Sequence, residues 1–333
     1  MSLRTFIFAA LVAVVSTGNH AHAKVLKFAT IAPEGSAWMK TMNDAGNEVD
    51  RRTSGRVKFK FFTGGVMGND KAVLRKVKLG QLDGGMFTLG SLAESCPDMR
   101  IYGIPFLFPD MAAVDRVRAE LDPVLKECLK KGGFTSFGFA EGGVARFYSK
   151  EPVDSVDSMR GRKMWVPEGD VIGLAAMESL GLAPTPLPIT DVLTGLQTGL
   201  IEVAGNSSIG ALALQWHTAT KYVTTTPLLY VAAVLAVKNA SYEEIDAKDR
   251  DVVSEVLERV YKGFNKQNRS DEDKAYKTLI SEGLTPVDPK PGEVDRWRAV
   301  ASKLANDMAS RGEFSMDLYK RALSLASKGP GTK

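Results

Sequence analysis

Short apolar runs alternate along the chain with segments in which apolar residues recur every third or fourth position, a pattern typical of strands followed by amphipathic helices. Residues 25–46 begin with an apolar run, pass through Pro-Glu-Gly-Ser and continue with helical spacing. Residues 162–180 repeat this order around Pro-Glu-Gly-Asp. In each segment the last turn residue, Ser36 or Asp170, stands where a helix N-cap is expected. The pattern therefore predicts a strand–turn–helix unit that occurs twice.

A second unit is repeated in the same order. Residues 74–83 and 193–202 share their apolar spacing, a glycine and a final acidic residue at a constant sequence offset. Each segment predicts an amphipathic helix that stops at the glycine and leads into a short strand. Two repeated units predict an α/β protein with two lobes of similar design, each with helices packed on a mainly parallel sheet.

The two lobes are expected to share a cleft, because ligands of open α/β sheets bind beyond the carboxyl ends of the strands. Trp38, Phe87, Thr88 and Ser207 become candidate cleft residues by this rule. The loops expected to line the cleft are 31–36, 63–70 and 86–91 of the first lobe and 167–170 and 205–208 of the second.

Residues 245–281 contain no proline and a single glycine. Apolar stripes at 253–264 and 276–280 flank the wholly polar segment 265–274. One helix of this length would run ~55 Å, so it would pack on one lobe, cross water and pack on the other. Two helices with a loop near 268–271 are the alternative.

The first 23 residues are interpreted as a cleaved secretory signal peptide. Arg4 precedes an apolar run at 6–15, and Ala-His-Ala at 21–23 offers small residues at a cleavage site. A membrane anchor is the alternative, but the run is too short to span a bilayer. The later apolar run at 228–237 is also short and predicts a buried strand. The chain is therefore expected to be exported and not to span a membrane.

The charge and the numbers of histidines and cysteines exclude several classes of function. Lys and Arg number 43 against 39 Asp and Glu, and the net charge of +4 is too small to indicate a nucleic-acid partner. Two of the three histidines lie in the leader, so only His217 remains, which excludes a histidine-rich metal site. Cys96 and Cys128 cannot form a thiolate zinc site by themselves. After export they could form a disulfide or remain two buried thiols. We expect no cofactor and no metal.

No catalytic signature was found along the chain. Residues 85–91 have the glycine spacing of a phosphate loop, but Ser91 stands where lysine is required. A Gly-x-Ser-x-Gly elbow is absent from the sequence. Glu168 and Asp170 could form a carboxylate pair across the cleft, although helix caps and first-turn charges also account for such residues. An exported α/β enzyme that uses these carboxylates is therefore an alternative function, and the main expectation is that the protein is not an enzyme.

Four motifs together resemble one family over about residues 25–325. They are Thr-Ser-Gly-Arg-Val at 53–57, Ile-Pro-Phe-Leu-Phe at 104–108, Gly-Arg-Lys-Met-Trp-Val-Pro at 161–167, and the segment 193–206 with its final asparagine. The chain resembles the solute-binding receptors of tripartite ATP-independent periplasmic (TRAP) transporters, in the branch loosely named for C4-dicarboxylates.

The resemblance implies a two-lobed periplasmic-binding-protein fold with a ligand cleft between the lobes and one long helix shared by both. It places lobe 1 at 24–143 plus about 233–271, and lobe 2 at 144–232 plus about 272–330. It also implies a periplasmic receptor that closes around a small organic acid and docks onto a two-component TRAP membrane permease driven by an ion gradient. A solute-binding co-receptor of a sensor system is an alternative with the same fold.

One departure from the family concerns the ligand. Members usually place an arginine, paired with a substrate carboxylate, where this chain has Trp165, which cannot form that pair. Arg146 is the nearest candidate for a second family arginine, and a shift of one residue would turn its side chain to the other face. Asn206 matches the ligand-binding asparagine of the family. With Arg146, Asn206 and Glu168 in the site, we expect a monocarboxylate whose flat apolar part stacks on Trp165.

Overall fold

The computed structural model describes residues 23–328, so all but the last residue of the predicted signal peptide lie outside the described residues. One sheet runs through this part of the chain in the order β2-β1-β3-β9-β4-β7-β5-β6, and β8 and β10 extend it beside β4. The strands are β1 (Lys24–Ala29), β2 (Val57–Phe62), β3 (Gly84–Thr88), β4 (Phe134–Ser149), β5 (Met164–Pro167), β6 (Pro184–Leu187), β7 (Val203–Asn206), β8 (Tyr222–Thr224), β9 (Leu229–Lys238) and β10 (Thr285–Val287).

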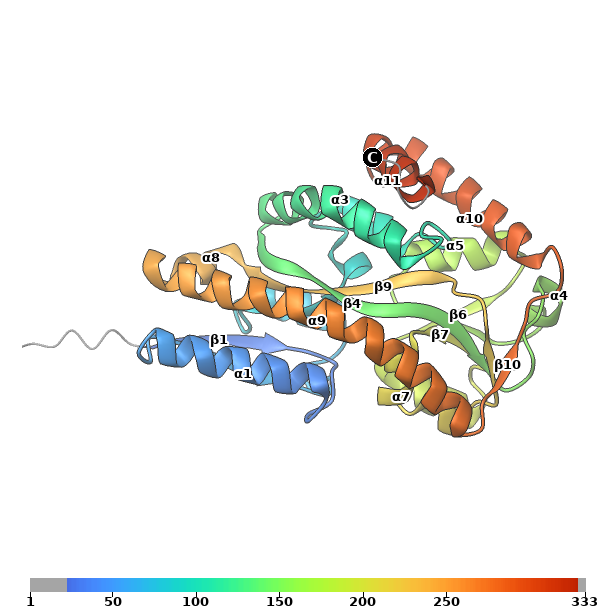
Figure 1. Ribbon diagram of the computed structural model, residues 1–333, viewed down its shortest axis with the longest axis horizontal. Helices are drawn as coiled ribbons and strands as arrows, with labels where there is room; N and C mark the ends of the chain where they lie inside the picture. The colour runs from blue at the N-terminus through green and yellow to red at the C-terminus, as the bar shows by residue number, and fades with distance from the viewer. Residues whose placement is uncertain (1–22, 329–333) are drawn as a thin grey trace, which may run out of the picture.

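Helices cover the sheet in both lobes (Figure 1). They are α1 (Ala37–Arg52), α2 (Asp70–Lys78), α3 (Met111–Lys131), α4 (Val156–Met159), α5 (Val171–Ser179), α6 (Val192–Thr198), α7 (Ser208–Ala213), α8 (Asn239–Glu243), α9 (Ala247–Ser281), α10 (Glu293–Ser310) and α11 (Met316–Ser327). Short 3-10 helices lie at η1 (Leu89–Leu92), η2 (Pro97–Gly103), η3 (Ile189–Asp191) and η4 (Trp216–Thr218).

Strand direction separates the two lobes. In lobe 1, β1 runs parallel to β2 and β3, and in lobe 2, β5 runs parallel to β6 and β7. The long strands β4 and β9 pair antiparallel with each other and join the two parallel parts. The predicted two-lobed α/β fold is therefore confirmed, and the apolar run at 228–237 forms most of strand β9.

The duplicated plan is also confirmed at the level of single residues. Gly80 after α2 and Gly199 after α6 have φ angles of +75° and +77°, a left-handed conformation in which glycine carries no Cβ penalty. Strands β3 and β7 then begin at equivalent positions. The acidic residue before each strand accepts a backbone hydrogen bond. Asp83 accepts from the N–H of Lys27 in β1, and Glu202 accepts from the N–H of Lys163, directly before β5.

Helix α9 is a single helix of 35 residues, so the alternative of two helices with a loop near 268–271 is wrong. Its first half buries Val253 and Leu257 in the core of lobe 1, and Leu279 near its end lies in the core of lobe 2. It packs on α1, on β4 and on α7, and Figure 1 shows it running across both lobes. The shared helix implied by the resemblance is thus present.

The C-terminal helices lead from lobe 2 to lobe 1. Helix α10 packs on α5 of lobe 2, and its second half buries Met308 in the core of lobe 1, whereas α11 packs on α3 of lobe 1 and buries Tyr319 and Ala322 there. The expected division had assigned residues 272–330 to lobe 2 as a whole. An amphipathic pattern shows that a helix has a buried face but not which neighbour covers it, so the position of α11 could not be read from the sequence.

The two cysteines are bonded to each other, which decides the alternative that the sequence left open. The Cys96–Cys128 disulfide ties the segment before η2 to α3. Of the helices within residues 23–328, none combines the length and the apolar composition needed to cross a bilayer.

Candidate functional site

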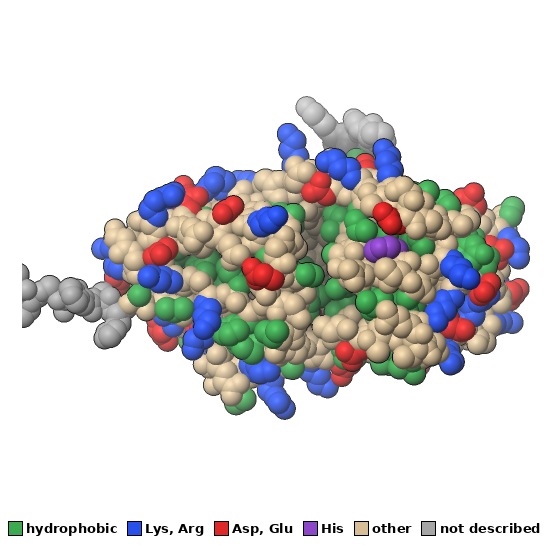
Figure 2. All heavy atoms as spheres, turned by 90° about the horizontal axis from the view of Figure 1, so that it is seen from below, with side chains coloured by type: hydrophobic (Ala, Val, Ile, Leu, Met, Phe, Trp, Pro, Cys, Tyr) green, Lys and Arg blue, Asp and Glu red, His purple; other side chains and the backbone are tan. Residues whose placement is uncertain are grey.

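The strand-end loops of both lobes meet across a cleft, and Figure 2 shows the surface hollowed between the lobes. Asn69, in the lobe 1 loop, donates a hydrogen bond of 2.6 Å from Nδ2 to Oε2 of Glu168 in lobe 2. Nearby, a Cβ on Gly65 would lie 2.9 Å from Cγ2 of Thr190. Ile172 of α5 packs into the core cluster of lobe 1. The lobes therefore touch along one edge of the cleft.

Strands β4 and β7 bring two of the predicted ligand residues together. Arg146 and Asn206 are directly opposite each other in this antiparallel pair, so their side chains share one face of the sheet. Arg146 thus lies on the same sheet face as Asn206, the other candidate ligand residue. Its side chain is 15% exposed and Asn206 is 9% exposed.

Both side chains carry a buried nitrogen without a protein partner. Nε of Arg146 and Nδ2 of Asn206 have no hydrogen-bond acceptor among the described residues. A buried donor left without a partner costs ~1–3 kcal/mol, so such groups call for an explanation. The Oδ1 atom of Asn206 is satisfied, because it accepts a hydrogen bond from the N–H of Ser207. Two such donors on one sheet face make this face a candidate for binding a polar group.

The other side of the Arg146 guanidinium is occupied by Glu272 of α9. Oε1 of Glu272 lies 3.4 Å from Nη1 of Arg146 and 2.9 Å from the N–H of Ser208, and its Oε2 accepts from the N–H of Ile209 at 3.1 Å. Arg146 also lies over the ring of Tyr276, 4.9 Å from its centre. The carboxylate of Glu272 thus joins the shared helix, Arg146 and the start of α7.

Glu272 was not among the residues singled out from the sequence. The segment 265–274 is wholly polar and was expected to cross water, but the structure buries Asn268 and Glu272 within it, both 7% exposed. These two residues are four positions apart and so share one helix face. An Asn and a Glu at this spacing were the available signal, although solvated helix faces carry the same residue types.

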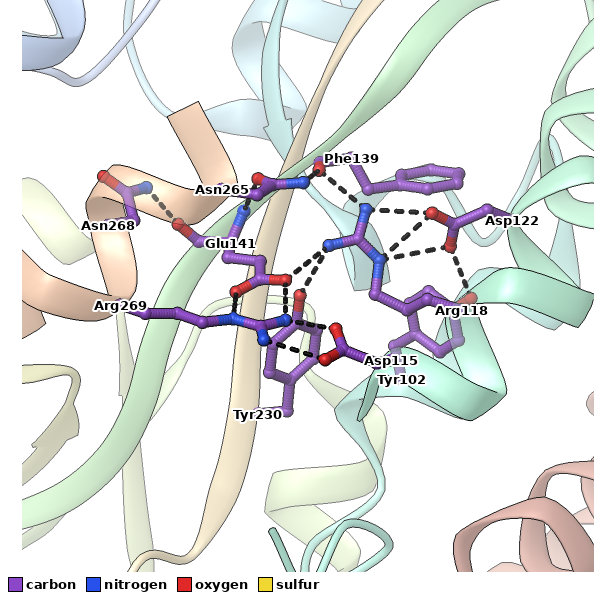
Figure 3. A network of polar contacts seen from close by, with 10 residues as sticks. All are labelled: Tyr102, Asp115, Arg118, Asp122, Phe139, Glu141, Tyr230, Asn265, Asn268 and Arg269. Atoms are coloured by element: carbon purple, nitrogen blue, oxygen red, sulfur yellow. Dashed lines mark hydrogen bonds and ion pairs between the residues drawn. The ribbon is translucent and has the colours of Figure 1, made fainter. Parts of the chain in front are cut away.

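A second polar cluster, centred on Glu141 of β4, lies on the lobe 1 side of α9 (Figure 3). Glu141 is 3% exposed, and its carboxylate accepts hydrogen bonds from Arg118 of α3 and from Arg269 of α9. Arg269 also pairs with Asp115. Its hydrogen bonds to Glu141 and to Asp115 raise the pKa of Arg269, and the bond that it donates to Asp115 lowers the pKa of that carboxyl.

Backbone groups complete the Glu141 cluster. Asn265 accepts from the N–H of Glu141 and donates to the carbonyl of Phe139, and Asn268 donates to the carbonyl of Glu141. The side chain of Arg118 further contacts Asp122, the hydroxyl of Tyr230 and a backbone carbonyl. These contacts fasten α9 and α3 to the strand that connects the lobes.

The remaining polar candidates have local partners. Thr88 is exposed, and its N–H and hydroxyl both donate to Oδ2 of Asp70, at 2.9 and 2.7 Å. Asp170 caps α5 by accepting from the N–H of Gly173, as the sequence predicted. Burial raises the pKa of the Asp70 and Asp170 carboxyls. Ser207 caps α7 beside Asn206.

The aromatic candidates differ in exposure. Trp165 is 4% exposed, packs edge-to-face on Trp216 in the core of lobe 2, and donates its indole N–H to the carbonyl of Leu187 at 2.9 Å. Phe87 is fully buried in the core of lobe 1. Trp38 is half-buried, packs on Phe264 of α9 and lines a small cavity in lobe 1. Trp38 is therefore the most accessible of the three rings.

The structure thus brings Arg146, Asn206 and Ser207 together, while Glu168 lies at the cleft edge and Trp38, Phe87 and Thr88 lie on lobe 1. Within residues 23–328, no three His, Cys, Asp or Glu side chains are grouped so that they could hold a metal ion. Two lobes, a shared helix and an interlobe cleft with open hydrogen-bond donors define the class of two-lobed solute-binding proteins.

Comparison with known proteins gives the family. Residues 28–311 match the bacterial extracellular solute-binding proteins of family 7, and the chain belongs to this family of TRAP transport receptors. A solute-binding protein of Verminephrobacter eiseniae is 27% identical over 77% of this chain and 75% of its own.

Solved structures of TRAP periplasmic solute-binding proteins have the same fold. One from Xanthobacter autotrophicus gives a TM-score of 0.82 at 21% identity, and the alignment covers 91% of this chain and all of the other. One from Shewanella oneidensis gives a TM-score of 0.84 at 19% identity, with 92% and 100% covered. The chain is accordingly a solute-binding receptor for transport.

Proposed function

We propose that this receptor captures a small organic acid between its lobes and delivers it to a two-component TRAP permease in the membrane. On this proposal residues 1–23 direct export and are removed, and the receptor works in the periplasm. The observation that carries the proposal is the pair of buried, open donors on Arg146 and Asn206. The related structure from Xanthobacter autotrophicus holds β-D-galacturonate and that from Shewanella oneidensis holds succinate, which are both organic acids.

The solute is further proposed to carry one carboxylate. Among the described residues, Arg146 is the one cation paired with Glu272. The resemblance implies that Trp165 stands where members of the family usually have a carboxylate-pairing arginine. A second buried carboxylate would have no cation of this kind, and an unpaired buried charge is costly. The single acid group would bind Nε of Arg146 and Nδ2 of Asn206.

A flat apolar part of the solute is the last element of the proposal. Trp165 was expected to stack on this part of the solute. It lies on β5, the strand that pairs with β7, and β7 ends at Asn206, which supports a contact between its ring and the solute. Its burial and its satisfied indole N–H favour packing instead. Trp38 offers the more accessible ring, so Trp38→Ala and Trp165→Ala should be compared. Removal of the ring that contacts the solute should weaken the binding free energy by ~1–3 kcal/mol.

A thermal-shift screen of small organic acids, followed by calorimetry, tests the function. A bound solute at a hundredfold excess over Kd should stabilise the protein by ~2.7 kcal/mol. Arg146→Ala should then weaken binding by ~2–5 kcal/mol, the usual loss when one partner of a buried charge pair is removed. Arg160→Ala, an exposed arginine of lobe 2, is the control and should bind normally. Equal affinity of Arg146→Ala and wild type would contradict the proposed anchor.

A further inference from the structure

Glu272 occupies an unusual place for a carboxylate in a receptor for organic acids. It projects from the shared helix α9 against the same guanidinium that is proposed to hold the solute, and it is almost completely buried. Gly143, with a φ of +95°, leaves the space for it, because a Cβ there would lie 2.5 Å from Oε2 of Glu272. The backbone of β4 is thus shaped around this carboxylate.

The contacts of Glu272 divide the guanidinium of Arg146 into two edges. Nη1 faces Glu272 and, at 3.5 Å, the carbonyl of Val144. Nε is buried on the other edge and has no acceptor among the described residues. Asn206, opposite Arg146 in the strand pair, has its open Nδ2 on the same sheet face. Glu272 therefore holds the arginine at Nη1, while the Nε edge keeps no acceptor among the described residues.

The charges around the pair are few. Strand β7 (Val-Ala-Gly-Asn) and helix α7 (Ser-Ile-Gly-Ala-Leu-Ala) contain no charged residue. On β4 the neighbouring carboxylate, Glu141, is already paired with Arg118 and Arg269. On α9, Asp271 pairs with Lys274 at the surface. The charges of Arg146 and Glu272 thus cancel, and a bound solute with one carboxylate gives the three groups a net charge of about −1.

We propose that Glu272 is a specificity-determining residue that positions Arg146 and restricts the solute to a single carboxylate. A second carboxylate on the solute would add a like charge in a buried place that already holds two, and such repulsion grows as the local dielectric falls. Arg146 cannot compensate it, because its charge is shared with Glu272. The proposal rests on the proposed function, since it assumes that Arg146 binds the acid group of the solute.

A purely structural role for Glu272 is the competing explanation. Its carboxylate accepts from the N–H groups of Ser208 and Ile209 at the start of α7, which stabilises a helix by itself. If the role of Glu272 is structural, any substitution of it should weaken the binding of all solutes to the same extent. A charge filter instead changes the ratio between solutes that differ only in the number of carboxylates, so the ratio separates the two roles.

The test compares Kd values by calorimetry for wild type and Glu272→Gln. Glutamine keeps an oxygen acceptor for α7 but removes the negative charge. Two matched pairs of acids are used as probes: butyrate with succinate, and galactonate with galactarate. In each pair the second acid has one carboxylate more than the first. Wild type should bind the monocarboxylate of a pair at least about tenfold more tightly, and Glu272→Gln should reduce this preference by at least about tenfold. The control Asp271→Asn removes the same charge one residue away, at the surface, and should keep the preference.

Each outcome decides the proposal. A preference that is unchanged in Glu272→Gln while both affinities fall alike would overturn it and leave a structural role. Equal binding of both members of a pair by wild type would overturn it without any variant, even if Glu272→Gln did not fold. If wild type binds a monocarboxylate but Arg146→Ala binds it equally well, the anchor of the proposed function is wrong, and the charge filter built on it falls for that separate reason.

Discussion

Two buried carboxylates, Glu141 packed against the shared helix and Glu272 on it, have different surroundings. The carboxylate of Glu141, on the lobe 1 side, is held by two arginines, and its backbone N–H and carbonyl are bound by Asn265 and Asn268 (Figure 3). The carboxylate of Glu272, on the lobe 2 side, is also fully bonded, but its partner Arg146 and the neighbouring Asn206 each keep an open donor.

This difference indicates how one helix serves both structure and binding. A polar cluster whose members are all paired holds elements in one arrangement, and breaking it costs stability. A cluster that keeps open donors has lost part of that stability and can recover it from a ligand. The Glu141 cluster therefore stabilises the connection between the lobes, and on the proposed function the Glu272 cluster forms part of the solute site.

The largest expected effect comes from breaking the paired cluster. Glu141→Ala leaves Arg118 and Arg269 without their shared carboxylate and should lower the free energy of unfolding by ~3–5 kcal/mol. Urea denaturation measures this change. Asp307→Asn, which removes an exposed pair with Lys303 on α10, is the control and should cost less than ~1 kcal/mol. A loss for Glu141→Ala as small as that of the control would contradict a framework role.

The open cluster should show the opposite profile. Asn206→Asp keeps the oxygen that accepts from Ser207 but removes the open donor and adds a negative charge, so solute affinity should fall by ~1–3 kcal/mol, and stability should fall by less than in Glu141→Ala. Calorimetry and urea denaturation measure the two quantities. Asn306→Asp, an exposed position on α10 with the same change of charge, should alter neither. A variant that loses stability but keeps its affinity would reverse the assignment of the two clusters.

Acid should weaken the Glu141 cluster through Asp115. Arg269 lowers the pKa of Asp115 in the folded protein, so this contribution to stability is present above the ordinary Asp pKa of about 3.9 and is lost as the pH falls through the lowered value. Wild type should therefore be more stable than Asp115→Asn at neutral pH, and the difference should shrink in acid. Urea denaturation between neutral and acid pH measures it. A difference that does not depend on pH would contradict the charge pairing.

The smallest effect is expected at the edge of the cleft, where Asn69 bonds Glu168. Asn69→Ser keeps a side-chain cap for α2 but cannot reach Glu168, and the pair is exposed, so solute affinity should fall by less than ~1 kcal/mol. Calorimetry checks this. A loss as large as that of Asn206→Asp would move the important contacts from the Arg146 anchor to the cleft edge.

Local patterns allowed most of the fold to be predicted. The repeated segments ending in Gly80 and Gly199 required a left-handed residue and a following strand, and both are present in each lobe. The absence of proline in α9 and its two apolar stripes indicated one long helix. Such features are set by neighbours in sequence, so they can be read without knowledge of the partner surface.

The site was predicted less completely, because it depends on packing between distant segments. Arg146 and Asn206 are candidates from the sequence, but whether they share a face depends on the β4–β7 register. Glu272 was missed, since a polar helix segment looks the same whether it faces water or a buried arginine. Trp165 was expected to line the cleft, but its indole is buried against Trp216. No local sequence pattern distinguishes an aromatic residue that lines a cleft from one that packs in the core.

The central claim is that the open donors beside Glu272 receive the acid group of the solute. A crystal structure of the receptor with a solute found in the thermal-shift screen tests this most directly. We expect the carboxylate oxygens of the solute within hydrogen-bond distance of Nε of Arg146 and Nδ2 of Asn206, with Glu272 still bound to Nη1 and to the start of α7. A bound solute whose carboxylate lies elsewhere, with both donors still unpaired, would contradict it.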